Sequence, residues 1–348
     1  MKILGIDTSC DDTCVALLEI RNSKLKILSN IISSQVKLHA KYGGVYPSLA
    51  KREHIKNLPL VFRRATKRIK LSEIDLVSVT NGPGLEPCLW QGVNFANELA
   101  KNLKVSLIPV NHIEAHILVN SPKIFPAVCL VVSGGHTTLF LMKGIGKYML
   151  IGETRDDAAG ECFDKVARIL GLGYPGGPIV AEMATKIKNK KLKIKNIKLP
   201  RPMMYQKNYD FSFSGLKTAV LYDYRSRPSK IRKSKQYIRE MCREVQQAII
   251  DVLIHKTIKA AKDFRVKSII FGGGVAANEE LRRQFKEKIR KEIPNTEYLI
   301  PDTKYCTDNA AMVAATALFN WQRNKPAFAK ATAGKSWKEI EVDANLKI

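Results

Sequence analysis

The sequence has no C-x-x-C pair, and its seven cysteines are scattered along the chain. That distribution fits free thiols in a reducing compartment and argues against a disulfide scaffold or a cysteine-based zinc site. No apolar run reaches the ~20 residues that span a bilayer, and an acid, Asp7, comes too early for a secretory signal peptide. We therefore expect a cytoplasmic protein that makes no contact with a membrane.

Two common nucleotide-binding signatures are also missing. No Gly-Lys-Ser/Thr follows the glycine run at 272–274, so there is no Walker A loop, and no G-x-G-x-x-G follows the first predicted strand. Two glycine turns remain, Ser133-Gly134-Gly135 and the run at 272–274. Both let the backbone approach a ligand closely and offer N–H groups to phosphate oxygens. The second is the stronger candidate, because a predicted strand runs into it and a predicted helix follows.

Acidic residues are scarce relative to basic ones, since 32 Asp and Glu stand against 58 Lys and Arg, a net charge of +26. Such a charge predicts binding to a polyanion, most simply nucleic acid, with strong salt dependence. A Lys-rich surface would give the same number, but the charge is concentrated in the segments 186–201 and 225–239. A membrane surface is the weaker alternative, because neither segment has a strong apolar helical face.

The chain does contain a histidine pair, His112 and His116, in the segment Asn-His-Ile-Glu-Ala-His. Residues four apart on a helix point the same way, so the two imidazoles can share one divalent metal ion. Alternatively, one or both histidines simply pack and hydrogen-bond. Glu114 lies about 200° around the helix from each histidine, which disfavours a zincin peptidase. Asp308 is the candidate third ligand.

The hydrophobic pattern predicts an α/β protein with two similar halves, each opening with three strands and a polar turn between the first two. Two such lobes would face each other across a central cleft, where the loops that follow strand ends bind ligands. The predicted strands are 2–8, 14–20, 25–33, 75–80 and 105–110 in the first half, and 127–132, 138–142, 148–154, 268–271 and 298–300 in the second.

This pattern places an N-terminal lobe at residues 1–115 and a C-terminal lobe at 116–308. The second lobe would carry a basic insertion at about 185–235. A helix at 309–325 is expected to pack back on the first lobe, and residues 326–348 are expected to form a partly ordered tail.

An acidic cluster stands out in so basic a chain, and its members are Asp156, Asp157, Glu161 and Asp164. Acids at a helix start complement the helix dipole, and that explains Asp156 and Asp157 as well as a functional role does. Asp164 lies deeper in the predicted helix, so the dipole explains it less well. Further along, Phe211 and Phe213 predict a buried turn rather than a platform for stacking bases.

Nine segments in order carry a resemblance to a known family: Asp7 to Asp11, Asn111 to His116, Val132 to Thr137, Thr154 to Glu161, Phe163 to Lys165, Tyr174 to Pro178, Phe211 to Ala219, Gly273 to Asn278 and Cys306 to Asn309. The chain resembles the tRNA N6-adenosine threonylcarbamoyltransferase family, TsaD, earlier described as a sialoglycoprotein endopeptidase. The resemblance covers roughly residues 2–325, and the FSFSGLKTA run looks like the bacterial branch.

The resemblance implies an actin-like, sugar-kinase-like fold of two lobes. It implies transfer of a threonylcarbamoyl group from threonylcarbamoyl-AMP to N6 of the adenosine 3′ of the anticodon, in tRNAs that read codons beginning with A. By position in the family pattern, His112, His116 and Asp308 would hold one divalent metal ion, iron (Fe²⁺) or zinc. Asp11 would lie near the reacting carbonyl as a candidate base. The adenylate would be bound by Val131, Val132, Ser133, Gly134, Gly135, Asp164, Gly177 and Asn278.

The resemblance also implies partners. Family members generally act with a TsaB-like paralogue of the same fold and a TsaE-like small ATPase, while a separate synthase supplies threonylcarbamoyl-AMP. ATP or ADP binding is a further expectation. The sequence departs from the family pattern at Asp12, where Glu is usual, and at Glu86 and Trp90, where small or aliphatic residues are usual. Helices near the latter contact a partner subunit in this family, so the choice of partner stays open.

Two other functions stay open on the residues alone. A regulatory ATPase of the same fold would use Asp7 and the glycine turns but would leave the histidine pair idle. A metalloprotease would need a general base near the metal, and Glu114 is misplaced for that role.

Overall fold

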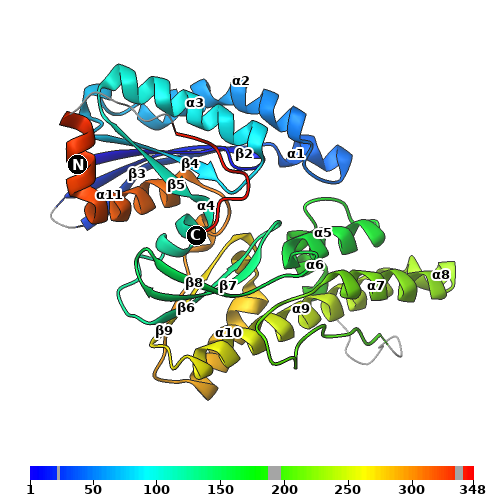
Figure 1. Ribbon diagram of the computed structural model, residues 1–348. Coiled ribbons are helices and arrows are strands. Elements are labelled where there is room, and N and C mark those ends of the chain that lie inside the picture. The colour runs from blue at the N-terminus through cyan, green and yellow to red at the C-terminus, as the bar shows by residue number, and fades with distance from the viewer. Residues whose placement is uncertain (22–23, 187–196, 334–339) are drawn as a thin grey trace. The chain divides into compact units, whose positions relative to one another are not determined.

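The computed structural model describes residues 1–21, 24–186, 197–333 and 340–348, with side chains described to residue 323 in the last helix. Most of the basic segment predicted at 186–201 lies outside these ranges. The chain divides into two compact units (Figure 1), of which unit 1 comprises Met1–Ser121 and Asp308–Ile348, and unit 2 comprises Pro122–Thr307. Within the described ranges, no helix is both long enough and apolar enough to cross a membrane.

Unit 1 is built on a five-stranded sheet with the order β3-β2-β1-β4-β5. The first three strands are antiparallel neighbours, whereas β4 and β5 run parallel to β1. Helices cover both faces of β1. Its side chains from Ile3 onward are therefore buried on both faces, and the strand is an almost continuous apolar run that ends at Asp7. The strands are β1 (Lys2–Asp7), β2 (Asp12–Arg21), β3 (Lys24–Ser34), β4 (Leu76–Gly82) and β5 (Ser106–Asn111).

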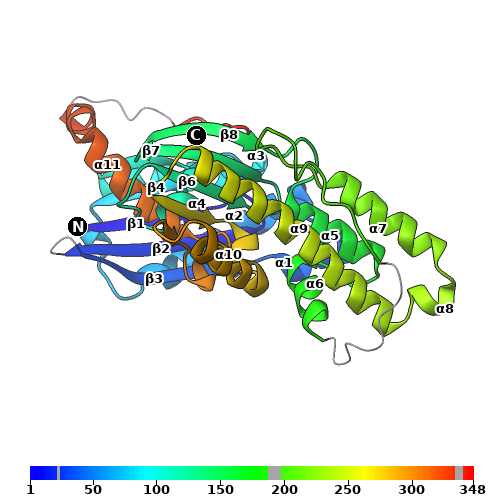
Figure 2. The same ribbon diagram turned by 90° about the horizontal axis from the view of Figure 1, so that it is seen from below.

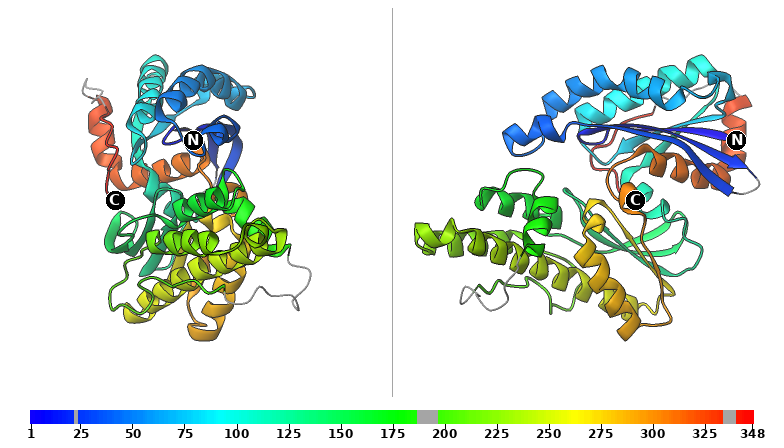
Figure 3. Two further views of the ribbon diagram at one scale, coloured as in Figure 1. Left: turned by 90° about the vertical axis from the view of Figure 1, so that its right-hand side faces the viewer. Right: turned by 180° about the vertical axis from the view of Figure 1, so that it is seen from behind.

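Helices α2 and α3 lie on one face of this sheet and α11 lies on the other (Figures 1 and 3). Gly5 in β1 allows α11 to approach, because a Cβ there would lie 2.3 Å from the carbonyl oxygen of Ala310. The helices of unit 1 are α1 (Val36–His39), the 3-10 turns η1 (Ala40–Tyr42) and η2 (Leu71–Glu73), α2 (Pro47–Thr66), α3 (Glu86–Leu103), α4 (His112–Leu118) and α11 (Ala310–Ala333).

Unit 2 repeats this topology, with the sheet order β10-β9-β6-β7-β8. Strands β6, β7 and β8 are antiparallel neighbours, whereas β9 and β10 run parallel to β6. The long helix α9 packs against β6, α6 and α10 (Figure 2). The strands are β6 (Ala127–Val132), β7 (Thr137–Gly144), β8 (Lys147–Glu153), β9 (Ser268–Gly272) and β10 (Glu297–Leu299). The helices are α5 (Ala159–Ile169), α6 (Gly176–Thr185), α7 (Ser214–Ser226), α8 (Ser229–Arg232), α9 (Lys235–Asp263), α10 (Glu279–Glu292) and the 3-10 turns η3 (Gly274–Ala277) and η4 (Thr303–Tyr305).

The predicted α/β class and the duplicated architecture are confirmed, because both sheets have the same strand order and the same strand directions. The unit boundary falls after Ser121 rather than after Ala115, since α4 continues to Leu118 and contacts β5 and α11. Residues 340–348 lie against unit 1, where they hydrogen-bond to the end of β4. Pattern analysis also missed α6 and α7, whose first turns are glycine- and serine-rich and therefore predicted loops.

Candidate active site

Helix α4 carries the histidine pair, and Asn111 at the end of β5 begins this helix. The Asn111 Oδ1 accepts hydrogen bonds from the backbone N–H groups of Ile113 (2.8 Å) and Glu114 (3.1 Å), which makes it the N-cap. His112 and His116 follow on one face of the helix, both buried, with ring centroids 4.7 Å apart. The predicted helical spacing therefore brings the two imidazoles together.

Asp308 reaches the same place from the second chain segment of unit 1, two residues before α11. Its backbone is fixed by Cys14 on β2, whose thiol donates to the Asp308 carbonyl at 3.6 Å. Its Oδ1 lies 3.4 Å from the Nε2 of His112 and 3.4 Å from the Nε2 of His116. The three donor atoms all lie within 4.8 Å of one another. The three residues predicted from the sequence as metal ligands therefore lie together in one cluster.

The donor geometry fits a divalent metal ion. Two ligand atoms that each lie about 2.1 Å from a tetrahedral ion are about 3.4 Å apart, which is the spacing of each histidine from Asp308. Neither ring nitrogen of His116 has a hydrogen-bond partner among the described residues, whereas buried nitrogens normally have one. The Asp308 side chain is 24% exposed, so the cluster is accessible from that side. Imidazole and carboxylate donors suit iron(II) or zinc.

Asp7 and Ser9, at the end of β1, hold the other side of the His112 ring. The Nδ1 of His112 lies 3.3 Å from the Asp7 Oδ2 and 3.2 Å from the Ser9 Oγ, while the Asp7 Oδ1 accepts from the Ser9 N–H at 2.9 Å. A carboxylate on the second nitrogen of a metal-binding histidine fixes the ring orientation. Sequence analysis missed this role and considered Asp7 only for a regulatory ATPase; the available signal was an acid that ends a largely apolar strand.

Charge is distributed unevenly within the cluster. Burial alone would lower the pKa of His112, but the carboxylates of Asp308 and Asp7 outweigh it and raise that pKa to about 10. Burial lowers the pKa of His116. Burial opposes ionisation of Asp308, but the two histidines hold its pKa well below the usual range. These pKa shifts favour an ionised Asp308 carboxylate beside a charged His112 and a neutral His116.

Asp11 lies in the hairpin between β1 and β2, in the same unit as the cluster. His54 on α2 fixes this hairpin, because its ring nitrogens lie 2.8 Å from the Thr13 Oγ1 and 2.9 Å from the Cys10 carbonyl oxygen. The Asp11 Oδ2 is buried and has no hydrogen-bond partner in the described part of the chain. Burial raises the pKa of Asp11, and it raises the pKa of the adjacent Asp12 to about 7. Both carboxylates thus accept a proton more readily than an exposed aspartate does.

Glu114 is buried but faces away from the cluster. Its Oε2 accepts a hydrogen bond from the Asn320 Nδ2 on α11 at 3.4 Å. The expectation that this carboxylate points away from the histidines is therefore met, and the general base of a zincin is missing from its required position.

The residues nominated for adenylate binding lie in unit 2, where β6 and β9 end side by side. Val131 pairs with Gly272 across these parallel strands. The side chains of Val131 and Val132 are fully buried, so only their main chain can meet a ligand. A Cβ added to Gly134 or Gly135 would meet no atom within 4 Å, so the turn after β6 is open.

Close backbone contacts hold the neighbouring loops against this turn. The N–H of Gly160, at the start of α5, donates to the Ser133 carbonyl at 3.2 Å, and a Cβ on Gly160 would lie 2.5 Å from that oxygen. Gly273 has φ +90°, and a Cβ there would lie 2.3 Å from the Val132 carbonyl oxygen. The two glycine turns and the start of α5 therefore form one continuous backbone surface.

Gly177 and Asn278 lie at the starts of α6 and α10, and Asp164 lies within α5. The Asp164 Oδ1 accepts from the N–H of Gly176 at 2.6 Å, which ties α5 to the first turn of α6, where Gly177 lies. The Asn278 Oδ1 accepts from the N–H of Leu281 at 3.0 Å and caps α10. Helix N-termini beside glycine turns are favourable sites for phosphate, so the placement is consistent with the predicted ligand.

Comparison with known proteins agrees with these features. A family model described as tRNA N6-adenosine threonylcarbamoyltransferase, TsaD, matches residues 26–315. The chain belongs to this family. A protein of that name from Syntrophomonas wolfei is 48% identical over 325 residues, which are 92% of each chain. Another from Thermosipho africanus is 47% identical over 320 residues, covering 90% of this chain and 92% of the relative.

The fold has solved counterparts. HypF from T. kodakarensis superimposes with a TM-score of 0.55 at 14% identity, covering 93% of this chain and 48% of its own. Component A of the (R)-2-hydroxyglutaryl-CoA dehydratase of Acidaminococcus fermentans gives 0.50 at 14% identity, covering 91% and 97%. These likenesses confirm the predicted actin-like, sugar-kinase-like fold.

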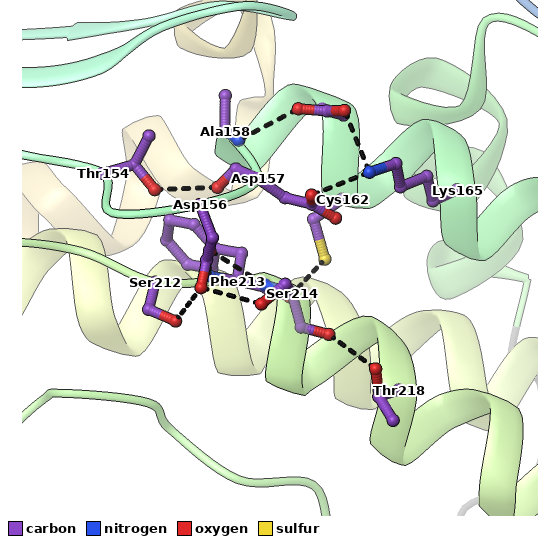
Figure 4. Close-up of polar contacts among 11 residues, drawn as sticks. Thr154, Asp156, Asp157, Ala158, Cys162, Lys165, Ser212, Phe213, Ser214 and Thr218 are labelled. Carbon is purple, nitrogen blue, oxygen red and sulfur yellow. Dashed lines mark hydrogen bonds and ion pairs between the residues drawn. The ribbon is translucent and has the colours of Figure 1, made fainter.

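The acidic cluster of this TsaD family member has a local structural role (Figure 4). Asp156 accepts hydrogen bonds from the hydroxyl groups of Ser212 (2.5 Å) and Ser214 (2.7 Å), and from the N–H groups of Phe213 (2.8 Å) and Ser214 (3.1 Å). It therefore joins the segment before α5 to the start of α7. The carboxylate of Asp157 pairs with Lys165 at 2.7 Å. The predicted burial of Phe211 and Phe213 is confirmed.

Proposed function

We propose that the chain transfers a threonylcarbamoyl group from threonylcarbamoyl-AMP to N6 of the adenosine 3′ of the anticodon, in tRNAs that read codons beginning with A. Membership of the TsaD family supports the reaction. The observation that carries the proposal is the cluster of His112, His116 and Asp308, whose donor atoms lie within 4.8 Å of one another. A regulatory ATPase would leave this cluster idle, and a peptidase would need a base that Glu114 does not provide.

The cluster would hold one Fe²⁺ ion, with Zn²⁺ as the alternative. Such an ion supplies Lewis acidity toward an acyl oxygen when it is bound. Asp7 and Ser9 keep the His112 ring in the orientation that this binding needs. In the transfer, the exocyclic amine forms a bond to the carbamoyl carbon, the bond from that carbon to the phosphate oxygen breaks, and AMP departs. Asp11, with its raised pKa, would take the amine proton.

The glycine surface of unit 2 would hold the AMP part of the co-substrate. The main chain of residues 131–135 offers N–H groups, and Asp164, Gly177 and Asn278 adjoin the helix starts that favour phosphate. Their own hydrogen bonds, Asp164 to the Gly176 N–H and Asn278 to the Leu281 N–H, fix the backbone rather than contact a ligand. ATP or ADP would use the same turns.

Basic residues would supply the affinity for tRNA. The segment 225–239, around α8, presents exposed cations such as Arg225, Lys230 and Lys233. Contacts of this kind bind the phosphate backbone without reading bases, and their strength falls with salt. We also propose that a TsaB-like paralogue and a TsaE-like small ATPase assist, that a separate synthase supplies the co-substrate, and that the reaction is cytoplasmic, where tRNA is.

The test is mass analysis of tRNA nucleosides after incubation of the purified protein with tRNA and threonylcarbamoyl-AMP, with candidate partners and with or without a chelator. We expect threonylcarbamoyladenosine from the wild type and from the control His255→Ala, whose imidazole lies on α9 beside Tyr205. We expect none from His112→Ala or after metal removal. Full activity of His112→Ala would refute the metal site, and no product from the wild type would favour the ATPase.

A further inference from the structure

The C-terminal segment 340–348, here named the strap, lies along unit 1 (Figure 1, red). Its residues alternate between partly buried and exposed, and the even-numbered ones face inward. Ile340 and Val342 pack against the core of unit 1. The strap turns at residues 344–345, and its apolar inward side chains make it a packed element of the fold.

The strap is hydrogen-bonded to the end of β4 and to the loop that follows it. The Asp343 N–H donates to the Asn81 carbonyl at 3.0 Å, and the Gly84 N–H donates to the Ala344 carbonyl at 3.2 Å. The Asn81 Nδ2 donates to the Glu341 carbonyl at 3.3 Å. The contact is close, because a Cβ on Gly82 would lie 1.9 Å from the Asp343 carbonyl oxygen.

Asn111 connects the strap to the helix that carries the histidines. Its Nδ2 donates to the Leu346 carbonyl at 3.2 Å, while its Oδ1 caps α4. One amide group therefore makes both bonds, and the strap fixes the plane in which the capping oxygen is presented. His112 is the next residue, so a change in the cap reaches the imidazole directly.

A second connection reaches the same ring. The Leu85 N–H donates to the Ser9 carbonyl at 2.8 Å, and a Cβ on Gly84 would lie 2.5 Å from that oxygen. The loop that the strap covers thus rests on Ser9, whose Oγ lies 3.2 Å from the Nδ1 of His112. Docking of the strap therefore fixes both Asn111, which caps α4, and Ser9, which contacts the His112 ring.

We propose that the strap is a positioning element for the histidine cluster and that Asn111 is the positioning residue through which it acts. The inference rests on the metal site proposed above. Loss of a partner that orients a metal ligand commonly weakens metal binding by about 10- to 100-fold. Asn111 acts one step further from the ion, so we expect a loss of about tenfold when the strap is undocked.

The experiment measures Zn²⁺ affinity by competition with a chromophoric chelator, in a double-mutant cycle. Asn111→Asp keeps the capping oxygen, since Asp is a good N-cap, but it loses the donor to Leu346. The second change ends the chain at Ile340. We expect each change to weaken Zn²⁺ binding by about tenfold. Asn111→Asp should weaken it no further in the shortened chain, because that chain already lacks the Leu346 carbonyl that Asn111 bonds. Asn94→Asp is the matched control, since it makes the same exchange at an exposed position of α3, and its affinity should stay near the wild-type value.

Each other result counts against the inference. If Asn111→Asp costs the same affinity in both backgrounds, its new charge acts directly and the strap plays no part. If the shortened chain is folded by circular dichroism and binds Zn²⁺ like the wild type, the strap does not position the cluster. If the shortened chain does not fold, the full-length variant Val342→Asp takes its place, with the same tenfold expectation. A wild type that binds no Zn²⁺ overturns both this inference and the metal site, whereas a bound wild type with unchanged variants overturns the inference alone.

Discussion

Substitution of Asp156 probes how the start of α7 is held. Its carboxylate accepts four hydrogen bonds from residues 212–214, at 2.5, 2.7, 2.8 and 3.1 Å. Two of the donors are backbone N–H groups near a helix start, which have no intrahelical partner. Asp156→Ala removes all four bonds, whereas Asp156→Asn keeps one acceptor oxygen and loses the bonds to the other.

The expected loss follows from these bonds. A hydrogen bond contributes a net 0.5–1.5 kcal/mol, and bonds to charged groups contribute more. The Asp156 network is largely exposed, so we take the lower half of that range for each bond. Asp156→Ala should then lower the free energy of unfolding by about 2–4 kcal/mol and Asp156→Asn by roughly half as much. Burial would raise the pKa of Asp156, but the four donors outweigh it and lower that pKa. The stabilisation is therefore present at neutral pH and is lost only as the pH falls through the lowered folded-state pKa.

The assay is denaturant unfolding at pH 7, with amide hydrogen exchange read for residues 213–218. Glu297→Gln, at an exposed carboxylate of β10, is the control and should change stability by less than about 0.5 kcal/mol. Exchange should quicken at the start of α7 in both Asp156 variants. If Asp156→Ala unfolds at the wild-type midpoint with unchanged exchange, water replaces the carboxylate without cost and the reasoning is wrong.

Three further predictions concern the two sites. Zn²⁺ at about 100 times its dissociation constant should stabilise the wild type by about 2.7 kcal/mol, and thermal unfolding of His112→Ala should show no such gain. In chelated protein, Asp12→Asn should gain stability over the wild type as the pH rises from about 4 to 7. The reason is that burial raises the folded-state pKa of Asp12 to about 7. Between these pH values Asp12 ionises in the unfolded chain but stays protonated in the folded one, so the wild type loses stability as the pH rises. A difference between the two proteins that does not change with pH would contradict this. Gly160→Ala should cost about 1–3 kcal/mol and weaken binding of an AMP analogue, because its Cβ would meet the Ser133 carbonyl, whereas Gly144→Ala, with no atom within 4 Å, should be tolerated. Equal behaviour of the two glycine variants in unfolding and AMP titration would refute the close contact.

The sequence predicts the structure best where a single hydrophobic or helical repeat decides which residues form a helix or strand. Helical spacing alone placed His112 and His116 on one face, and the apolar runs placed the strands of both sheets to within a few residues. Asp308 was nominated through its family position, and the contact of its Oδ1 with both imidazoles depends on tertiary packing of α11 against β1. No periodicity in the sequence contains that information.

The features that were missed depend on contacts between distant segments. Asp7 orients His112 across 105 positions of sequence, and the signal that remained was only an acid at a strand end. The segment 340–348 alternates apolar and polar residues, but this alternation does not identify Asn81 and Asn111 as the residues on which it docks. Helix α7 begins with Ser214 and Gly215, poor helix formers, and depends on Asp156 instead of propensity.

The duplicated topology explains how one fold can provide two kinds of site. In unit 1 the last residue pair of the first hairpin joins Asp7 to Cys14, and in unit 2 it joins Val132 to Thr137. The first hairpin ends its strand with a carboxylate that can orient an imidazole, and its longer loop carries further acids. The second ends its strand with an apolar residue and continues through Gly134 into an open turn. Because the backbone arrangement is shared, the two hairpins differ in chemistry through the side chains at their strand ends and in their loops.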